Sequence, residues 1–250
     1  MKKARGVTPG FLFWADEKTG EWAKMIGMSS DGLLGRFDAF WEDKARIEYG
    51  FKVPEQWFLD EAEKIGSDGL RVLDLGCGNG RNAVPLARMG CKVTGVDISK
   101  VALSLLKEKS QKEGVSVDVV QSDFASLSFP PESFGLCVCY NSIFNCRTDE
   151  LFEVFRKVKT WLSPKGKFLV TLRSTKTPAP DDSVLLPGES GTYITKRDGF
   201  EHFVHYSDCE EVEKLSLGWG LASLDEIEEL LGMGDKKRKV WTYRLTLEKQ

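Results

Sequence analysis

Long apolar runs are missing from this 250-residue sequence. The N-terminal segment MKKARGVTPGFLFW carries positive charge but has no apolar stretch of the ~7 to 15 residues that a signal peptide needs. No run anywhere in the chain approaches the ~18 apolar residues of a membrane-spanning helix. We therefore expect a cytoplasmic protein with no membrane partner.

Cysteine spacing typical of zinc sites is also missing. The six cysteines form no CxxC pair, and their density is far below that of a disulfide scaffold. Cys137 and Cys139 are expected to face opposite sides of one strand and so not to share a metal ion. We expect reduced thiols and no metal site.

An excess of positive charge is missing as well. The net charge is −3 and the pI is about 5.6, which argues against a surface that neutralises many phosphates. The one basic run, residues 236–239, is expected to be a solvated turn before a strand. A nucleic-acid partner is not expected.

The pattern of apolar residues divides the chain into segments. Residues 1–66 combine aromatic and charged residues at helical spacing and are expected to form a helical prefix or lid. Residues 67–172 alternate short apolar strands with helices, and Ser99 is placed to cap one of these helices. Strands are expected at 71–75, 91–98, 116–123, 134–141 and 166–172, with helices at 81–89, 100–114 and 149–162. This alternation predicts an α/β fold with a doubly wound parallel sheet.

The C-terminal part differs in composition. Residues 173–206 begin with a stretch rich in Pro, Gly, Ser and Asp, which predicts a long substrate-side excursion rather than a regular element. Residues 207–250 are expected to complete the sheet with a helix over 208–217 capped by Ser207, a strand at 219–224 and a final antiparallel strand at 240–247. The residues just before the basic run look like an acidic helix. The four segments together are expected to form one domain.

A glycine-rich turn follows the first predicted strand. Gly76, Gly78 and Gly80 lie between this strand and the next helix, where a ligand can approach the backbone and meet the first N–H groups of the helix. A dinucleotide fingerprint requires a third glycine at the position held by Arg81. The loop therefore favours a different nucleotide-like ligand.

Carboxylates stand at the ends of the next two predicted strands. Asp97 lies about twenty residues beyond the loop, where a carboxylate can accept hydrogen bonds from both hydroxyls of a ribose. Asp123 can accept from an exocyclic amine while Phe124 packs on an adenine face. The carboxyl ends of parallel strands share one edge of the sheet, so these groups define a crevice there.

The segments VLDLGCGNGRNAVPLA, VTGVDIS, QSDF, FGLCVCYN and LSPKGKFLVTL resemble, in order, the motifs of class I S-adenosylmethionine-dependent methyltransferases. The glycine-loop wording and the tail GTYITKRDGFEHFVHYSDCEEVEKL are similar to the small-molecule branch that includes tellurite-resistance and thiol methyltransferases. This resemblance covers about residues 65–172, and the tail match is less specific.

The resemblance implies an S-adenosylmethionine site. Asp74 and the loop backbone would hold the methionine end, Asp97 the ribose, and Asp123 with Phe124 the adenine, while Asn141 would lie beside the sulfonium. The residues implied to bind the cofactor are Asp74, Gly76, Cys77, Gly78, Asn79, Arg81, Asp97, Ile98, Asp123, Phe124 and Asn141. The sequence Tyr140-Asn141-Ser142-Ile143 departs from an Asn-Pro-Pro-Tyr motif, so methylation of nucleic-acid or protein amines loses support.

Methyl transfer from a sulfonium needs a general base only when the acceptor arrives protonated. His202, His205 and Tyr140 are the candidates for such a base, and a packing role is an alternative for each histidine. The acceptor pocket is expected beneath the 173–206 excursion and an aromatic roof. The aromatic residues expected in this roof are Trp14, Trp22, Phe37, Phe40 and Trp41. The acceptor is expected to be a small molecule, with an RNA (tRNA) methyltransferase and a non-catalytic cofactor-binding regulatory module as alternatives.

Overall fold

The computed structural model describes residues 30–43, 53–197, 200–231 and 238–250. Trp14 and Trp22 of the expected aromatic roof lie outside the described residues, as do Lys236 and Lys237 of the basic run. The side chains discussed below all lie within these ranges.

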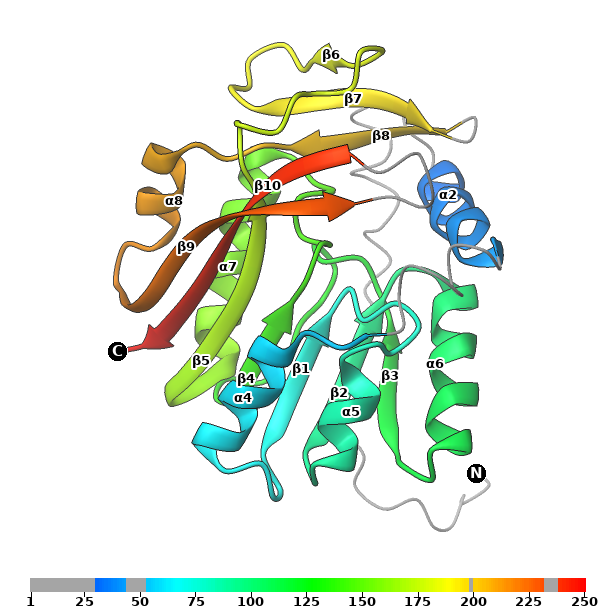
Figure 1. Cartoon of the computed structure of the whole chain (residues 1–250), viewed down its shortest axis with the longest axis vertical. Coiled ribbons are helices and arrows are strands. Elements are labelled where there is room, and N and C mark those ends of the chain that lie inside the picture. Colours follow the sequence, from blue (N-terminus) through cyan, green and yellow to red (C-terminus); the bar gives the residue numbers. More distant parts are fainter. Residues whose placement is uncertain (1–29, 44–52, 198–199, 232–237) are drawn as a thin grey trace, which may run out of the picture.

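A seven-stranded sheet forms the centre of the molecule (Figure 1), with strand order β3-β2-β1-β4-β5-β10-β9. Strands β1 to β5 run parallel, and β10 pairs antiparallel with both β5 and β9. The strands are β1 (Arg71–Leu75), β2 (Lys92–Asp97), β3 (Val117–Gln121), β4 (Phe134–Cys139), β5 (Leu162–Arg173), β9 (Trp219–Leu231) and β10 (Arg238–Lys249). The predicted α/β parallel sheet and its final antiparallel strand are confirmed.

Helices cover both faces of this sheet, as its alternating side chains require. The helices are α2 (Ser30–Glu42), α4 (Gln56–Ile65), α5 (Ala83–Arg88), α6 (Lys100–Lys112), α7 (Thr148–Trp161) and α8 (Cys209–Leu215). Ser99 caps α6 as predicted, since its side chain accepts a hydrogen bond from the Ala102 N–H at 3.1 Å. Helix α5 is shorter than expected and begins two residues after Arg81.

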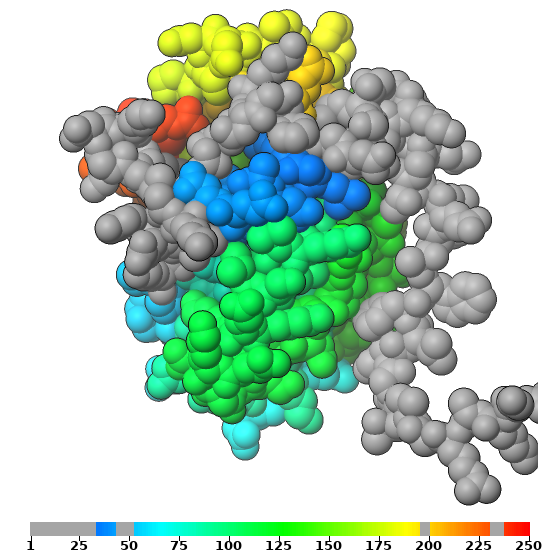
Figure 2. Space-filling model, turned by 90° about the vertical axis from the view of Figure 1, so that its right-hand side faces the viewer, coloured from blue at the N-terminus to red at the C-terminus, as the bar shows by residue number. Residues whose placement is uncertain are grey.

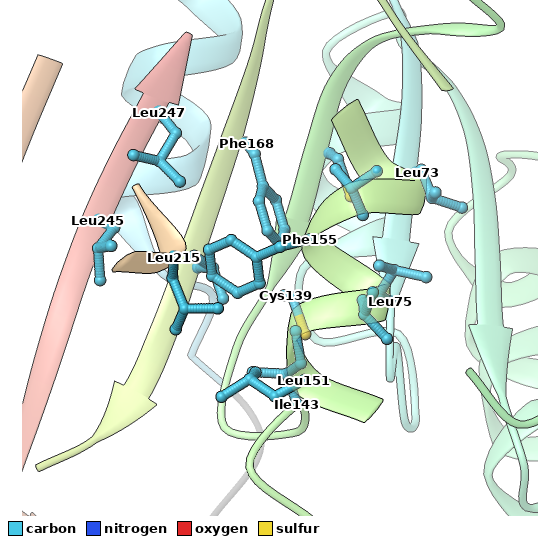
Figure 3. Close-up of a cluster of buried hydrophobic side chains, with 14 of the residues drawn as sticks. Leu73, Leu75, Cys139, Ile143, Leu151, Phe155, Phe168, Leu215, Leu245 and Leu247 are labelled. Atoms are coloured by element: carbon cyan, nitrogen blue, oxygen red, sulfur yellow. The ribbon is translucent and has the colours of Figure 1, made fainter. Parts of the chain in front are cut away.

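Two hydrophobic clusters lie on opposite faces of the sheet. Along β1, Val72 belongs to the cluster with α4, α5 and α6, while its neighbour Leu73 belongs to the cluster with α7 and α8. Figure 3 shows the second cluster, where Phe155 of α7 and Phe168 of β5 point toward one another. Their ring centroids are 5.2 Å apart and their planes meet at 72°, a favourable edge-on geometry.

The 173–206 segment is more regular than predicted. It contains β6 (Val184–Leu185), β7 (Thr192–Arg197) and β8 (Phe200–His205), which form a separate antiparallel sheet. In Figure 1 this small sheet lies beyond the carboxyl end of the parallel strands, and β8 contacts α2. The Pro- and Gly-rich composition reflects the turns between these strands. The apolar alternation of β8 was not used to predict a strand.

Helix α2 lies across one end of α6, as Figure 2 shows for the face that carries both. Its side chains reach the ends of the parallel strands, where Trp41 is buried at 8% exposure. Part of the predicted aromatic prefix therefore lies at the edge of the sheet that carries the glycine loop.

Two further predictions for the C-terminal segment are wrong. Asp208, and not Ser207, caps α8, since its side chain accepts a hydrogen bond from the Glu211 N–H at 2.9 Å. The acidic stretch that resembles a helix belongs to β9, which pairs with β10 along its whole length. Cross-strand pairing outweighs the helical spacing of Leu224, Ile227 and Leu230.

The prediction for Cys137 and Cys139 is also wrong. Residues two apart on a strand point to the same face, and both thiols lie in the α7-side cluster. Burial raises the pKa of each thiol above its ordinary value. They are packing residues, and within the described ranges no group of three or more His, Cys, Asp or Glu side chains is placed to hold a metal. The same part of the chain has no helix long and apolar enough to cross a membrane.

Candidate cofactor and acceptor site

The glycine loop lies where the strand order reverses. Strand β1 pairs with β2 on one side and with β4 on the other, so the crossover helices leave toward opposite faces and open a crevice at this point. The N–H groups of Gly76 and Cys77 donate to the Val96 carbonyl at 2.8 and 2.9 Å. These bonds anchor the loop to the end of β2.

The loop glycines leave room that other side chains enter. Gly76 has φ +69°, and a Cβ there would collide with the Ser142 side chain. Gly78 has φ +54°, and a Cβ there would collide with the Trp41 indole. Both backbone conformations disfavour other residues, so the loop presents bare backbone to Ser142 and Trp41.

Three buried oxygen atoms near this loop have no hydrogen-bond partner among the described residues: Oδ2 of Asp74, Oδ1 of Asn79 and Oδ1 of Asn141. Asp74 is 2% exposed, and burial raises its pKa to about 7, with Arg81 and the Ala83 N–H opposing the shift. A buried acceptor without a donor costs about 1–3 kcal/mol. Three of them at one edge of a sheet indicate a ligand that supplies donors.

Asp97 is tied to the loop on one side and to α6 on the other. Its Oδ2 accepts from the Gly78 N–H and its Oδ1 from the Ser99 N–H, both at 2.9 Å. Burial raises the pKa of Asp97 against the effect of these bonds, and Asp38 raises it further. Each carboxylate oxygen retains a second lone pair, which leaves capacity for a ribose hydroxyl.

The predicted adenine side is less completely assembled. Phe124 is half-buried, and its Cζ lies 3.6 Å from the position of a Cβ on Gly76. Asp123 is occupied within its own turn, where it accepts from the Ser126 N–H at 2.6 Å and the Ser126 hydroxyl at 3.2 Å. Ile98 is half-buried, and its carbonyl accepts from the Gln121 amide at 3.2 Å.

The polar groups of Cys77 and Arg81 contact other parts of the protein, whereas the loop backbone faces the crevice. The Cys77 thiol packs into the sheet, 3.0 Å from a Cβ built on Gly95, and burial raises its pKa. The Arg81 guanidinium lies over the Tyr140 ring at 4.5 Å and near Glu55 at 3.7 Å. Of these two, only the backbone of Cys77 belongs to the loop edge.

Two residues at this edge were missed by sequence reasoning. Ser142 follows β4 and covers Gly76, and Asp38 of α2 accepts from the Ser99 hydroxyl at 2.5 Å and the Val101 N–H at 3.3 Å. Ser142 lies 66 positions from the loop and Asp38 61 from Ser99. In the sequence, only Asn141, which precedes Ser142, indicated this part of the site, because it lies at the end of β4.

Tyr140 is held in a polar cluster with β9. Its hydroxyl donates to Oε1 of Glu229 at 2.8 Å, and the same oxygen lies 3.3 Å from Arg244. Burial raises the pKa of Tyr140, and the nearby carboxylates of Glu55 and Glu229 raise it further. A phenol with a raised pKa is a poor proton acceptor at neutral pH, so this geometry argues against Tyr140 as a general base.

The two histidines lie on β8 in different environments. The His205 ring is 1% exposed, with Nδ1 2.8 Å from the Thr192 hydroxyl and Nε2 2.6 Å from Glu211. Both ring nitrogens are therefore engaged, which supports the packing alternative for His205. His202 is 4% exposed and lies opposite Thr195 in the small sheet. Of the three predicted bases, only His202 remains a candidate.

A family model described as "Methyltransferase domain" matches residues 72–166, which include the glycine loop, Asp97, Asp123 and Asn141. Residues 72–166 therefore form a methyltransferase domain.

Related sequences match the same part of the chain. Phosphoethanolamine N-methyltransferase 3 of Arabidopsis thaliana is 31% identical over 52% of this chain and 25% of its own length. A ubiquinone biosynthesis O-methyltransferase of Rhizobium leguminosarum is 41% identical over 34% of both chains. The aligned region spans about half or less of the curated relatives that it matches.

Solved structures share the fold over a larger part of the chain. TehB of Haemophilus influenzae superposes with a TM-score of 0.64 and 20% identity, covering 84% of this chain and 67% of that one. Magnesium protoporphyrin IX methyltransferase of Synechocystis, solved with bound S-adenosylhomocysteine, gives 0.63 and 15% identity over 87% and 98% of the chains. At this identity the likeness establishes the fold.

The residues of this methyltransferase domain fit a sulfonium nucleoside cofactor. The three orphaned oxygens can accept hydrogen bonds from an ammonium group and other N–H donors, and Asp97 can accept them from ribose hydroxyls. The backbone at Gly76 and Gly78 lies in a cradle that a Cβ would fill. The structure therefore brings together most of the predicted cofactor residues and leaves Asp123, Cys77 and Arg81 with other partners.

Proposed function

We propose that this protein transfers a methyl group from S-adenosylmethionine to a small-molecule acceptor. The observation that carries the proposal is the set of orphaned acceptors at Asp74, Asn79 and Asn141 beside the bare glycine loop. The named relatives act on phosphoethanolamine and in ubiquinone biosynthesis, which supports a small acceptor. No metal takes part in this proposal.

The residues of the chain would bind and orient the reactants. Asp74 and Asn79 would accept from the methionine end of the cofactor, and Asp97 would accept from its ribose. Phe124 would pack against the adenine. When bound, the cofactor supplies an electrophilic methyl group. The remaining task of the protein is to position the acceptor and to exclude water.

The elements above the strand ends would enclose the acceptor. Trp41 of α2 covers Gly78, and β8 contacts α2, so both lie at the open edge of the crevice. We propose that α2, the described part of the predicted 1–66 prefix that lies at this edge, and the segment 173–206 together form a cover over one catalytic core, completed by residues 207–250. His202 on β8 would be the base for an acceptor that arrives protonated.

Isothermal titration calorimetry with S-adenosylmethionine, S-adenosylhomocysteine and NAD tests the cofactor. We expect both sulfur nucleosides to bind and NAD not to bind. A reversed preference contradicts the proposal. Binding of S-adenosylmethionine without turnover, over a broad panel of hydroxyl, amine and thiol acceptors, would favour a non-catalytic regulatory module.

The test for an RNA acceptor is methyl transfer from labelled cofactor to total tRNA. We expect no transfer, because the chain has a net charge of −3. We also propose a cytoplasmic location. All six cysteines are free thiols and five of them are buried, as expected of a chain that folds in a reducing compartment.

A further inference from the structure

Arg173 is the last residue of β5, at the same edge of the sheet as the glycine loop. Strand β5 pairs with β4 up to Cys139 and Val170, and beyond this pair the Thr171 hydroxyl accepts from the Asn141 N–H at 2.8 Å. Arg173 therefore lies beside the loop that carries Asn141 and Ser142. Its guanidinium lies 4.6 Å from the centroid of the Phe144 ring in that loop.

The Arg173 side chain is buried, and no anionic group in the described part of the chain pairs with it. It is 5% exposed, Nη1 is fully buried without a hydrogen bond, and within the described residues the guanidinium forms no hydrogen bond or ion pair. A buried charge without a partner is costly, and folded proteins normally pair it. Two half-buried arginines of the region are arranged differently: Arg81 lies beside Glu55, and Arg244 beside Glu55 and Glu229.

The surroundings of Arg173 are suited to an anion. Glu229 is a carboxylate whose charge acts on Arg173, and its Oε1 already accepts from the Tyr140 hydroxyl and from Nη2 of Arg244. Arg238 adds a second positive charge nearby. Burial lowers the pKa of Arg173, yet an arginine stays protonated in proteins, so the positive charge persists.

We infer that Arg173 binds a carboxylate on the methyl acceptor. Its planar guanidinium can donate two parallel hydrogen bonds to a carboxylate, and the Phe144 ring beside it suits an apolar body. This inference rests on the proposed function, because it assigns the substrate class of the same site. A carboxylate there would lie beside Asn141, the residue expected next to the sulfonium.

The covering elements must move to admit such a ligand. The His205 N–H donates to the Phe144 carbonyl at 2.8 Å, and the Ser207 N–H donates to the Arg173 carbonyl at 2.7 Å. These bonds join β8 and the segment after it to both residues. Binding at Arg173 is therefore coupled to the position of the small sheet.

The test uses the full chain saturated with S-adenosylhomocysteine and two carboxylate probes, benzoate and hexanoate. Benzamide is the neutral counterpart of benzoate, and inorganic phosphate tests for a general oxyanion site. Binding is measured by saturation-transfer NMR and by the shift in the thermal midpoint. We expect at least one carboxylate to bind, benzamide to bind at least tenfold more weakly, and phosphate not to compete.

Two variants of Arg173 are compared with a matched control. Arg173→Met should lose carboxylate binding by at least tenfold, and Arg173→Lys should keep part of it, because a lysine keeps the charge without the planar pair of donors. Arg156→Gln is the control, since Arg156 is an exposed arginine of α7 paired only with Glu153. The control should bind the carboxylate as the wild type does.

The thermal midpoint of the ligand-free protein separates binding from packing. We expect Arg173→Met to be at least as stable as the wild type, because it removes an unpaired buried charge while it keeps most of the side-chain volume. A lower midpoint together with unchanged carboxylate binding would show a structural role and overturn the inference. If Arg173→Met fails to fold, the carboxylate affinity of Arg173→Lys decides.

Two further outcomes also overturn the inference. The first is that neither carboxylate binds the wild type. The second is that Arg173→Met weakens the binding of S-adenosylhomocysteine but leaves the binding of 5′-methylthioadenosine unchanged, which would assign Arg173 to the cofactor's own carboxylate. Failure of the wild type to bind S-adenosylhomocysteine is a separate result, and it contradicts the proposed function.

Discussion

The hydrophobic core beneath β5 and the edge of the sheet at the glycine loop differ in whether their buried groups have suitable neighbours. In the core, Phe155 and Phe168 are 3% and 0% exposed and lie against each other with apolar neighbours. At the edge, Asp74, Asn141 and Arg173 bury polar atoms that have no partner within the described ranges. The core stabilises the fold, whereas the edge gives up stability for groups whose partners a ligand supplies.

The largest effect is expected from the core side of this comparison. Phe168→Ala should lower the free energy of unfolding by about 3–5 kcal/mol, because it leaves a cavity between Phe155 and Trp219. Urea denaturation measures this loss. Below the unfolding transition, the affinity of the folded variant for S-adenosylhomocysteine should stay within about twofold; a much weaker affinity would mean that core and edge are coupled.

A change in the glycine loop should act in the opposite way. Gly78→Ala places a Cβ against Trp41 and where the cofactor approaches the backbone, so S-adenosylhomocysteine binding should weaken by at least ~100-fold, about 2.8 kcal/mol. Calorimetry measures this loss.

Gly114→Ala is the matched control for the loop variant. Gly114 has φ +67°, close to the +54° of Gly78, but its Cβ would meet nothing within 4 Å. Both variants should introduce similar backbone strain, whereas only Gly78→Ala also displaces the Trp41 ring and should lose binding. Equal binding by the two variants would place the cofactor elsewhere.

Asp97→Ala should affect both sides of the comparison. It removes the acceptor for the ribose and should weaken S-adenosylhomocysteine binding by about 1.5–3 kcal/mol. It also leaves the Gly78 and Ser99 N–H groups without their acceptor, so the thermal midpoint should fall. Addition of the ligand should recover less of the midpoint than it does in the wild type, and equal recovery would remove Asp97 from the ribose site.

The last expected effect concerns pH. Burial raises the pKa of Asp74 to about 7, so the folded state holds this proton more tightly than the unfolded state does. The stabilisation is complete below pH ~4 and is lost as the pH rises through about 7. Asp74→Asn should therefore stabilise the ligand-free protein at pH 8 and flatten the pH dependence of urea denaturation between these limits. A steeper dependence would contradict the assignment.

Local patterns in the sequence were sufficient for the core of the domain. The alternation of strands and helices, the glycine turn after β1 and the cap at Ser99 each depend on residues close together in the chain. Asp74, Asp97 and Asn141 could be placed at one edge because the ends of parallel strands meet there. The sequence also predicted that aromatic residues of the prefix would lie near this edge, and Trp41 does.

Contacts between distant segments decided the rest. The acidic stretch at the end of β9 became a strand because it pairs with β10, and Tyr140 lost its availability as a base through a bond to Glu229, 89 residues away. Ser142 over Gly76, Trp41 over Gly78 and the unpaired charge of Arg173 likewise appear only when the chain is folded. Short-range periodicity determines which elements form, whereas tertiary packing determines which polar groups are left without partners, because burial and pairing are properties of neighbours in space.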